Sequence, residues 1–307
     1  MEKGKGAVSL LVIVCAAFLL LLDSGVGGEF RTEKNWAEAV RNQGTQNPGV
    51  TVHPSFVTQH ELSTALAKGS TDPTFIDGRI ISVVIPHHLV ADRLIVNAMA
   101  VLAQQEPRLV VVVGPNHFNK GGKIITGVSS WQTPAGILYS EENLVKHLIE
   151  KGLAVADEEV LAQEHSIGAL VPFIKHFLPE SKLLPLVLHH DVSIREVDAL
   201  LSGLAPFMDE KVVLIASVDF SHYLTRSEAQ AKDLETLEVM RNFDYATLLR
   251  LNNDYVDSPI SLATAFRLAE KEGIRTFTIL DNTNSGIIMQ NDTIETTSYF
   301  TLMFTQK

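Results

Sequence analysis

Three apolar runs in the sequence each end at a histidine. Short β-branched apolar runs predict buried parallel strands, and open α/β sheets place their sites at the carboxyl ends of such strands. Neutral imidazoles bind divalent metals and also serve as general acids or bases. We therefore expect a metal or acid–base site at this edge of a sheet. The runs and their histidines are 80–85 with His87, 109–113 with His117, and 212–218 with His222.

His87 and His117 form the first candidate pair. Each follows an apolar strand and a proline within two residues, and one predicted helix joins the two strands. The strands should therefore be neighbours in a parallel βαβ unit, where the two imidazoles could share a metal. The alternative is two unrelated histidines that bond to loops. If the strand's alternation persists, His88 points away from His87 and forms a wall of the site.

Asp219 also follows a predicted strand, three residues before His222. Its carboxylate could orient an imidazole, or it could cap the next backbone turn. His165 lies at a predicted helix start, where the serine after it could be the cap and the histidine incidental. Asp257 precedes another helix start, a common place for aspartate. His189 and its neighbour His190 end a further strand and are weaker candidates.

The elements that must position these residues alternate between strands and helices. They favour a three-layer α/β fold in which helices flank a mainly parallel mixed sheet. Residues 131–136 read as a loop with turn residues. The expected helices are 90–105, 141–151, 165–177, 193–204, 226–242, 244–251 and 260–272, and the strands are 80–85, 109–113, 124–128, 183–188, 212–218, 274–280 and 298–304.

This α/β domain is expected to span residues 79–307. Residues 29–78 are polar and broken by glycine and proline, which favours a stalk or N-terminal extension. Residues 1–28 combine a basic flank, an apolar run and small residues, which indicates a signal peptide or an uncleaved membrane anchor. We expect the body to be exported in either case, and the chain to contact the membrane only if the segment stays attached.

Composition narrows the function. The net charge is −11 and the sequence has no lysine or arginine cluster, which argues against nucleic acid as a partner. The single cysteine, Cys15, lies in the apolar N-terminal run. An intrachain disulfide, a zinc–cysteine site and a cysteine nucleophile are therefore excluded for the body. No phosphate-binding loop, dinucleotide fingerprint or hydrolase elbow motif occurs.

Eight segments, in this order, resemble the Memo family, whose bacterial members are also called AmmeMemoRadiSam system protein B. Each segment alone is short, but their shared order makes the resemblance specific. The segments are Pro86-His87, Gly114-Pro-Asn-His117-Phe, Trp131-Gln-Thr-Pro-Ala-Gly136, Glu164-His165-Ser-Ile167, Leu183-Leu-Pro-Leu186, Ser217-Val-Asp219-Phe-Ser-His222-Tyr, Ser258-Pro259-Ile260 and Asn284-Ser285-Gly286.

The family is similar in fold to the class III extradiol ring-cleavage dioxygenases, non-haem iron(II) enzymes that use two histidines and a carboxylate. By this resemblance His87 and His117 match the two metal-binding histidines, whereas His165, Asp219 and His222 match other residues of the cleft. The third metal position in animal Memo proteins is a cysteine, and Asp257 is the nearest residue in this chain. This substitution implies a 2-His-1-carboxylate set, although Asp257 could instead only cap a helix beside a degraded site.

Three other positions also depart from the family's pattern. His88 stands where many relatives have a small residue, Gly168 where the family usually has glutamate, and Ile287 where an acidic residue is common.

The resemblance implies a divalent metal, iron(II) first, with copper and zinc as alternatives. The expected activity is oxidation of a small organic substrate by dioxygen, with His165 and His222 as the acid–base or substrate-binding pair and Asp219 supporting one of them. The alternatives are a metallohydrolase and a non-catalytic metal-binding protein. The family's name further implies radical-SAM and AMMECR-like protein partners.

Overall fold

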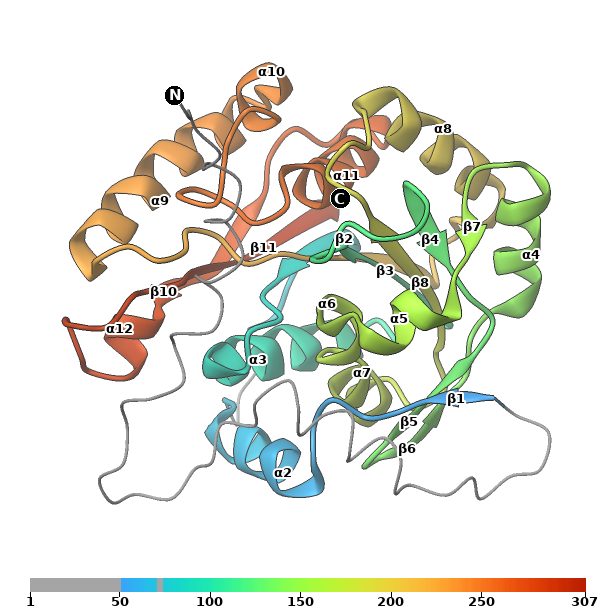
Figure 1. Ribbon diagram of the computed structural model, residues 1–307, viewed down its shortest axis with the longest axis horizontal. Coiled ribbons are helices and arrows are strands. Elements are labelled where there is room, and N and C mark those ends of the chain that lie inside the picture. The colour runs from blue at the N-terminus through green and yellow to red at the C-terminus, as the bar shows by residue number, and fades with distance from the viewer. Residues whose placement is uncertain (1–50, 71–73) are drawn as a thin grey trace, which may run out of the picture. The chain divides into compact units, whose positions relative to one another are not determined.

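A computed structural model describes residues 51–70 and 74–307 and places an eight-stranded sheet at the centre (Figure 1). Four neighbouring central strands, β2, β9, β3 and β8, run parallel. This arrangement confirms the predicted mixed, mainly parallel sheet. The strands in spatial order are β10 (Thr278–Asn284), β11 (Ser298–Gln306), β2 (Arg79–Ile85), β9 (Val212–Ser217), β3 (Leu109–Pro115), β8 (Lys182–Leu188), β4 (Ile124–Thr126) and β7 (Val155–Ala156).

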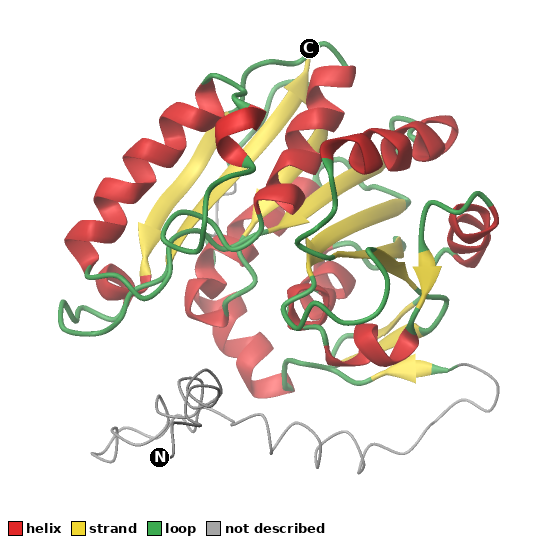
Figure 2. Ribbon diagram, turned by 45° about the horizontal axis from the view of Figure 1, so that its top comes forward, coloured by secondary structure: helices red, strands yellow, loops and turns green. Residues whose placement is uncertain are grey.

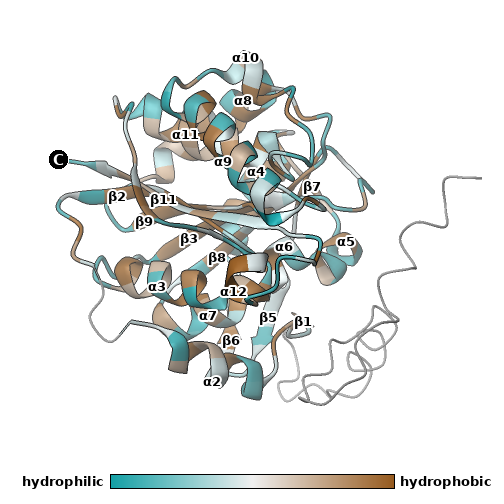
Figure 3. Cartoon of the chain, turned by 90° about the vertical axis from the view of Figure 1, so that its left-hand side faces the viewer, coloured by the Kyte–Doolittle hydropathy of each residue, from teal (hydrophilic) through white to brown (hydrophobic). Residues whose placement is uncertain are grey.

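Helices cover both faces of the sheet, which completes the three layers (Figures 2 and 3). Two apolar clusters separate the layers, and the central strands contribute side chains to both. Burial on both faces explains why these strands read as continuous apolar runs. One face carries α4 (Glu142–Glu150), α8 (Ile194–Leu204), α9 (Arg226–Arg241), α10 (Tyr245–Leu248) and α11 (Pro259–Lys271), and the other carries α2 (Gln59–Lys68), α3 (Asp92–Ala103) and α7 (Val171–Phe177).

One topological prediction was wrong. We expected β2 and β3 to be hydrogen-bonded neighbours, but β9 lies between them and pairs with both. Strands that are consecutive in sequence are often neighbours in a sheet. Here, however, β9, about a hundred residues later in the chain, pairs with one edge of β2 and one edge of β3 and so separates them. The carboxyl end of β9 therefore lies between those of β2 and β3.

Three local predictions also differ from the structure. The helix expected over 165–177 is two helices, α6 (His165–Gly168) and α7, because Pro172 begins a new helix. The loop expected at 131–136 is a hairpin of β5 (Ser130–Thr133) and β6 (Gly136–Leu138). The strand expected at 274–280 begins later, as the half-exposed edge strand β10. Apolar Ile274 instead packs in the core directly after α11.

Part of the expected extension packs on the α/β body. Val57, Leu62 and Ala65 are buried, and β1 (Val52–His53) pairs with β5. The first 28 residues, the expected signal or anchor, lie outside the described residues. Among the helices that are described, none has the length and apolar character needed to cross a membrane.

Candidate metal centre

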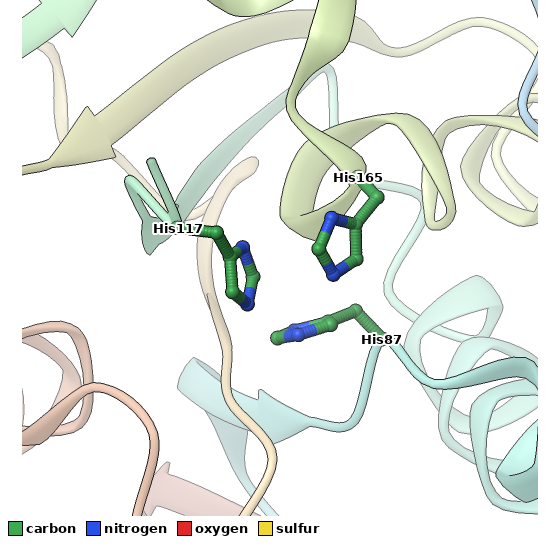
Figure 4. Close-up of side chains that lie close together, drawn as sticks. All are labelled: His87, His117 and His165. Carbon is green, nitrogen blue, oxygen red and sulfur yellow. The ribbon is translucent and has the colours of Figure 1, made fainter. Parts of the chain in front are cut away.

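His87, His117 and His165 converge at the carboxyl edge of the central strands (Figure 4). The ring centroid of His87 lies 5.2 Å from that of His117 and 5.3 Å from that of His165. One ring nitrogen of each lies within 4.8 Å of the others. His87 follows β2, His117 follows β3 and His165 begins α6. The fold thus brings together three of the six residues assigned to the site from sequence, and Asp219 and Asp257 also contact this group.

His87 is held in one tautomer. Its Nδ1 lies 3.0 Å from Ser217 Oγ, and that hydroxyl donates its hydrogen to the backbone oxygen of Ser166 at 2.5 Å. Nδ1 must therefore be the protonated nitrogen that donates to Ser217, which leaves the lone pair on Nε2. Burial is the main cause that lowers the pKa of His87 well below its ordinary value, and the nearby His117 lowers it further. A neutral ring with a free Nε2 lone pair is the form that binds a metal.

Glu164 holds His117 in the same tautomer as His87, with the proton on Nδ1. Its Nδ1 lies 2.7 Å from Glu164 Oε1, and its backbone N–H donates to Oε2 at 3.0 Å. Burial raises the pKa of the fully buried Glu164, but hydrogen bonds from His117 outweigh burial and bring the pKa below its ordinary value. The ionised carboxylate accepts the Nδ1 proton, so Nε2 of His117 also offers a lone pair.

Glu164 is a residue of the candidate centre that the sequence alone does not single out. In the sequence it stands only as the residue before His165, at a helix start. It caps α6 by accepting from the backbone N–H of Ser166 at 2.9 Å while it holds His117. Gly114 lets α6 approach this closely, because a Cβ there would lie 2.5 Å from Ser166 Oγ. The burial of Glu164 beside His117 could not be inferred without knowing that α6 packs on β3.

Asp257 faces both free lone pairs. Its Oδ2 lies 3.4 Å from His87 Nε2 and 4.0 Å from His117 Nε2. Both carboxylate oxygens are buried and no hydrogen bond of ordinary geometry reaches them in the described structure, although the backbone N–H groups of Asp219 and Ser258 lie near enough to favour the charged form. Burial, followed by Asp219, raises the pKa of Asp257 well above its ordinary value. Two ligands about 2.1 Å from one metal at about 90–110° are roughly 3.0–3.4 Å apart, so His87, His117 and Asp257 fit a divalent cation after small movements.

His165 occupies a different position relative to this set. Its ring stacks on that of His117, with centroids 4.0 Å apart and an interplanar angle of 23°. Because the two rings are stacked, their ring nitrogens do not point toward each other, so His165 would be a weaker choice than Asp257 to hold a metal together with His117. Partial burial, followed by His117, lowers the pKa of His165 to about 4 although 46% of its side chain is exposed. His165 is therefore a neutral imidazole at the open side of the centre.

Asp219 and His222, on the segment that follows β9, also lie near the centre. Asp219 Oδ1 accepts from the backbone N–H of His87 at 3.1 Å, and its Oδ2 lies 3.6 Å from His87 Nε2. The backbone N–H of Asp257 donates to the backbone oxygen of Asp219 at 3.1 Å, so this loop also positions Asp257. Nδ1 of His222 donates to the backbone oxygen of Phe220 at 2.7 Å, because a carbonyl can only accept. Nε2 of His222 therefore carries its lone pair.

His88 does not join the three clustered histidines. Its Nδ1 lies 2.7 Å from Oη of the buried Tyr299 on β11. Burial lowers the pKa of His88 and raises that of Tyr299, so both are neutral near pH 7. The weaker candidates His189 and His190 lie with Asp191 in a separate group after β8.

The glycine at 168, where a glutamate was expected from the resemblance, has a packing explanation. A Cβ at Gly168 would lie 2.1 Å from a ring carbon of Phe56. The N-terminal segment thus fills the space that a longer side chain would need. We find no comparable contact that explains Ile287.

Comparisons with known proteins agree with these features. The family model described as Memo-like protein matches residues 58–303. A MEMO1 family protein of Methanosarcina barkeri is 31% identical over 218 residues, which cover 67% of this chain and 80% of that protein. Another, of Caldivirga maquilingensis, is 27% identical over 240 residues, 73% of this chain and 83% of that protein.

A solved structure shows the same fold class. It is that of an uncharacterized protein from Escherichia coli K12, with a TM-score of 0.50 and 16% identity over 74% of this chain and 100% of that one. At this identity the likeness concerns the fold alone. The family model, in contrast, spans most of the α/β body and includes each residue of the candidate centre. The chain therefore belongs to the Memo-like protein family.

Proposed function

We propose that this chain binds one divalent metal, iron(II) by preference, and oxidises a small organic substrate with dioxygen. Asp257 carries the proposal, since a buried carboxylate without a partner faces two imidazoles whose free nitrogens point toward it. Such a carboxylate is costly to bury unless a cation compensates it. Two histidines and one carboxylate are the ligand set of non-haem iron(II) oxygenases, which supplies redox chemistry with dioxygen and leaves positions for substrate.

The surrounding residues suit this chemistry. His87 is almost fully buried, the side chain of His117 is 27% exposed and that of His165 is 46% exposed, so the centre opens toward His165. A substrate that enters from this side meets a neutral imidazole first. Because its pKa is lowered to about 4, His165 is neutral at pH 7 and its ring has a free lone pair, which lets it accept a hydrogen bond or, as a weak base, a proton from a bound substrate group. His222 offers a second lone pair, and Asp219 holds the backbone of His87 in place.

The test compares metals. The purified protein is loaded without oxygen with iron(II), zinc(II) or manganese(II), and oxygen consumption is followed with a panel of small organic compounds. We expect substrate-dependent consumption with iron only, and its loss in His87→Ala and His117→Ala. No consumption with any metal and any compound would contradict the oxidative function.

A metallohydrolase is the second candidate. The observation that favours it is again His165, because a neutral imidazole at the open side can take a proton from a water molecule as well as from a substrate. Hydrolysis with zinc or manganese, without oxygen consumption, would support this candidate. Export and the radical-SAM and AMMECR-like partners stay predictions that rest on the sequence alone.

A further inference from the structure

We propose that Asp233, on α9, is a positioning residue for the candidate metal centre and acts through Ser298 on the segment 219–222. The inference rests on the proposed metal site and adds a residue that fixes its geometry. It starts from a buried carboxylate outside the centre: Asp233 is 5% exposed and lies on α9, which packs against β10 and β11 (Figure 1).

Two side chains donate hydrogen bonds to Asp233. Ser298 Oγ donates to Oδ1 at 2.5 Å, and Asn282 Nδ2 donates to Oδ2 at 2.9 Å. Burial raises the pKa of Asp233 from 3.8 to about 6 against the effect of these two bonds, so the carboxylate is ionised at pH 7. No lysine or arginine pairs with it among the described residues, so its charge depends on the two donors.

The hydroxyl of Ser298 has one hydrogen, and the bond to Asp233 uses it. Ser298 Oγ can therefore only accept from its other neighbours. It accepts from the backbone N–H of Ser221 at 3.0 Å and from Ser221 Oγ at 2.8 Å. If Asp233 could not accept, the Ser298 hydrogen would need another acceptor, and it would turn to Ser221 Oγ and reverse that bond. The carboxylate thus sets the direction in which Ser298 holds Ser221.

Ser298 also holds this segment through the backbone. Its N–H donates to the backbone oxygen of Ser221 at 2.9 Å, and its backbone oxygen accepts from the N–H of Phe220 at 2.9 Å. Together with the two bonds to Ser298 Oγ, these bonds fasten Phe220 and Ser221 to β11. Because Phe220 and Ser221 lie between Asp219 and His222, the positions of both neighbours depend on this attachment.

The fastened segment positions the centre at three points. Asp219 Oδ1 accepts from the backbone N–H of His87 at 3.1 Å, and the backbone oxygen of Asp219 accepts from the N–H of Asp257 at 3.1 Å. The backbone oxygen of Phe220 accepts from Nδ1 of His222 at 2.7 Å. A displaced segment would therefore shift His87 and Asp257, two of the proposed ligands, and release the tautomer of His222. Partners that orient metal ligands contribute strongly to metal affinity.

The alternative is a purely structural role, in which Asp233 only holds α9 on the sheet. The variants Asp233→Ala and Ser298→Ala, and the double variant, separate the two roles. Thr236→Ala is the matched control, because Thr236 is a buried polar residue of the same helix whose hydroxyl donates within α9, to the backbone oxygen of Lys232 at 2.9 Å. Urea denaturation checks that each variant is folded.

Zinc affinity, measured by competition with a zinc-binding dye at pH 8, is the first readout. We expect about tenfold weaker binding in Asp233→Ala and in Ser298→Ala, the lower end of the effect of residues that orient metal ligands. The double variant should bind about as weakly as either single variant, because both changes break the same chain of contacts. Asp233→Asn, which keeps one acceptor oxygen, should lose less affinity than Asp233→Ala. Thr236→Ala should bind zinc like wild type.

The tautomer of His222 is the second readout and needs no metal. In the metal-free protein at pH 8, the ¹⁵N shifts of its ring nitrogens should show Nδ1–H in wild type and in Thr236→Ala. They should show a mixture of tautomers in Asp233→Ala and in Ser298→Ala. A purely structural role would leave this signal unchanged in every folded variant.

The possible failures are distinguishable. Wild-type zinc affinity together with a wild-type His222 tautomer, in folded Asp233→Ala or Ser298→Ala, would overturn the positioning role. Losses of affinity that add in the double variant would also overturn it, since Asp233 would then act by a route other than Ser298. Failure of the wild type to bind zinc would contradict the proposed function, and the His222 tautomer would then decide the positioning role by itself.

Discussion

Two groups of histidines end strands of the same sheet, and only one has the features of a metal centre. His87 and His117, after β2 and β3, are held by Ser217 and Glu164 and face a buried carboxylate that has no partner. The second group, after β8, consists of His189, His190 and Asp191, which are consecutive in sequence.

The polar side chains of the second group are exposed to solvent and pair with one another. The side chains of His190 and Asp191 are 67% and 62% exposed, and Asp191 Oδ1 lies 2.9 Å from His190 Nε2. The ring centroids of His189 and His190 lie 4.4 Å apart, and no buried side chain fixes their tautomers as Ser217 and Glu164 do for His87 and His117 in the described residues. The comparison teaches that a strand end supplies histidines, whereas burial, fixed tautomers and an unpaired carboxylate make them a candidate centre.

The largest expected effect is the loss of metal binding in a His87→Ala/His117→Ala variant. Changes to groups that only orient ligands already cost about 10–100-fold in affinity, so removing two ligands should cost more than roughly 100-fold. A His189→Ala/His190→Ala variant should bind like wild type. Competition with a zinc-binding dye and elemental analysis measure both. One-to-one iron binding by the well-folded first variant would refute the assigned centre.

Glu164→Gln tests whether the hydrogen bonds from His117 to Glu164 are needed for metal binding. An amide cannot serve both N–H donors of His117 as a carboxylate does, so the ring should lose its fixed tautomer. We expect metal affinity to fall about 10–100-fold. The exposed Glu159, on the preceding helix α5 (Glu158–Gln163), offers a matched Glu159→Gln control. Equal affinities in the two variants would show that Glu164 supports the fold only.

Asp257→Asn should stabilise the metal-free protein at neutral pH. Burial raises the pKa of Asp257 above its ordinary 3.8, so the native state binds more protons than the unfolded state above pH 3.8. Its contribution to stability is therefore present below that pH and lost as pH rises. Asparagine removes this loss, which we expect to add about 1–3 kcal/mol at pH 7 and nothing near pH 3.5.

Urea denaturation at the two pH values measures this change. Asp191→Asn, in the exposed group, should shift the free energy of unfolding by less than about 0.5 kcal/mol. A destabilised Asp257→Asn variant at pH 7 would mean that the carboxylate has partners that this geometry does not show.

His165→Gln should give the smallest effect, a change in the acid dependence of stability. The pKa of His165 is lowered to about 4 from 6.5, so the unfolded state binds more protons between these values. Wild-type stability should fall as pH decreases from 6.5 toward 4, and that of the variant should fall less. Because nearly half of the side chain is exposed, solvent screens this effect. Denaturation midpoints at pH 7 and 5 check it, with His190→Gln as control.

The two candidate histidine ligands could be predicted because their signals are local. An apolar strand, a proline and a histidine lie within one short segment, and the strand end fixes where the side chain emerges. Asp257 was reached only through a family resemblance, since an aspartate before a helix is too common to stand out. Glu164 was missed, because it holds His117 across 47 residues of chain.

The sequence by itself determined the sheet class, the strand-end positions of His87, His117 and Asp219, and the family. These depend on apolar periodicity and on short segments in order, which are properties of neighbouring residues. Only the tertiary structure decided the rest: β9 enters between β2 and β3, Ser217 on β9 contacts His87 across 130 residues, and the Asp257 carboxylate is buried facing two imidazoles. The physical reason is that tautomer, burial and carboxylate pairing depend on distances between distant segments, which packing sets and local pattern does not encode.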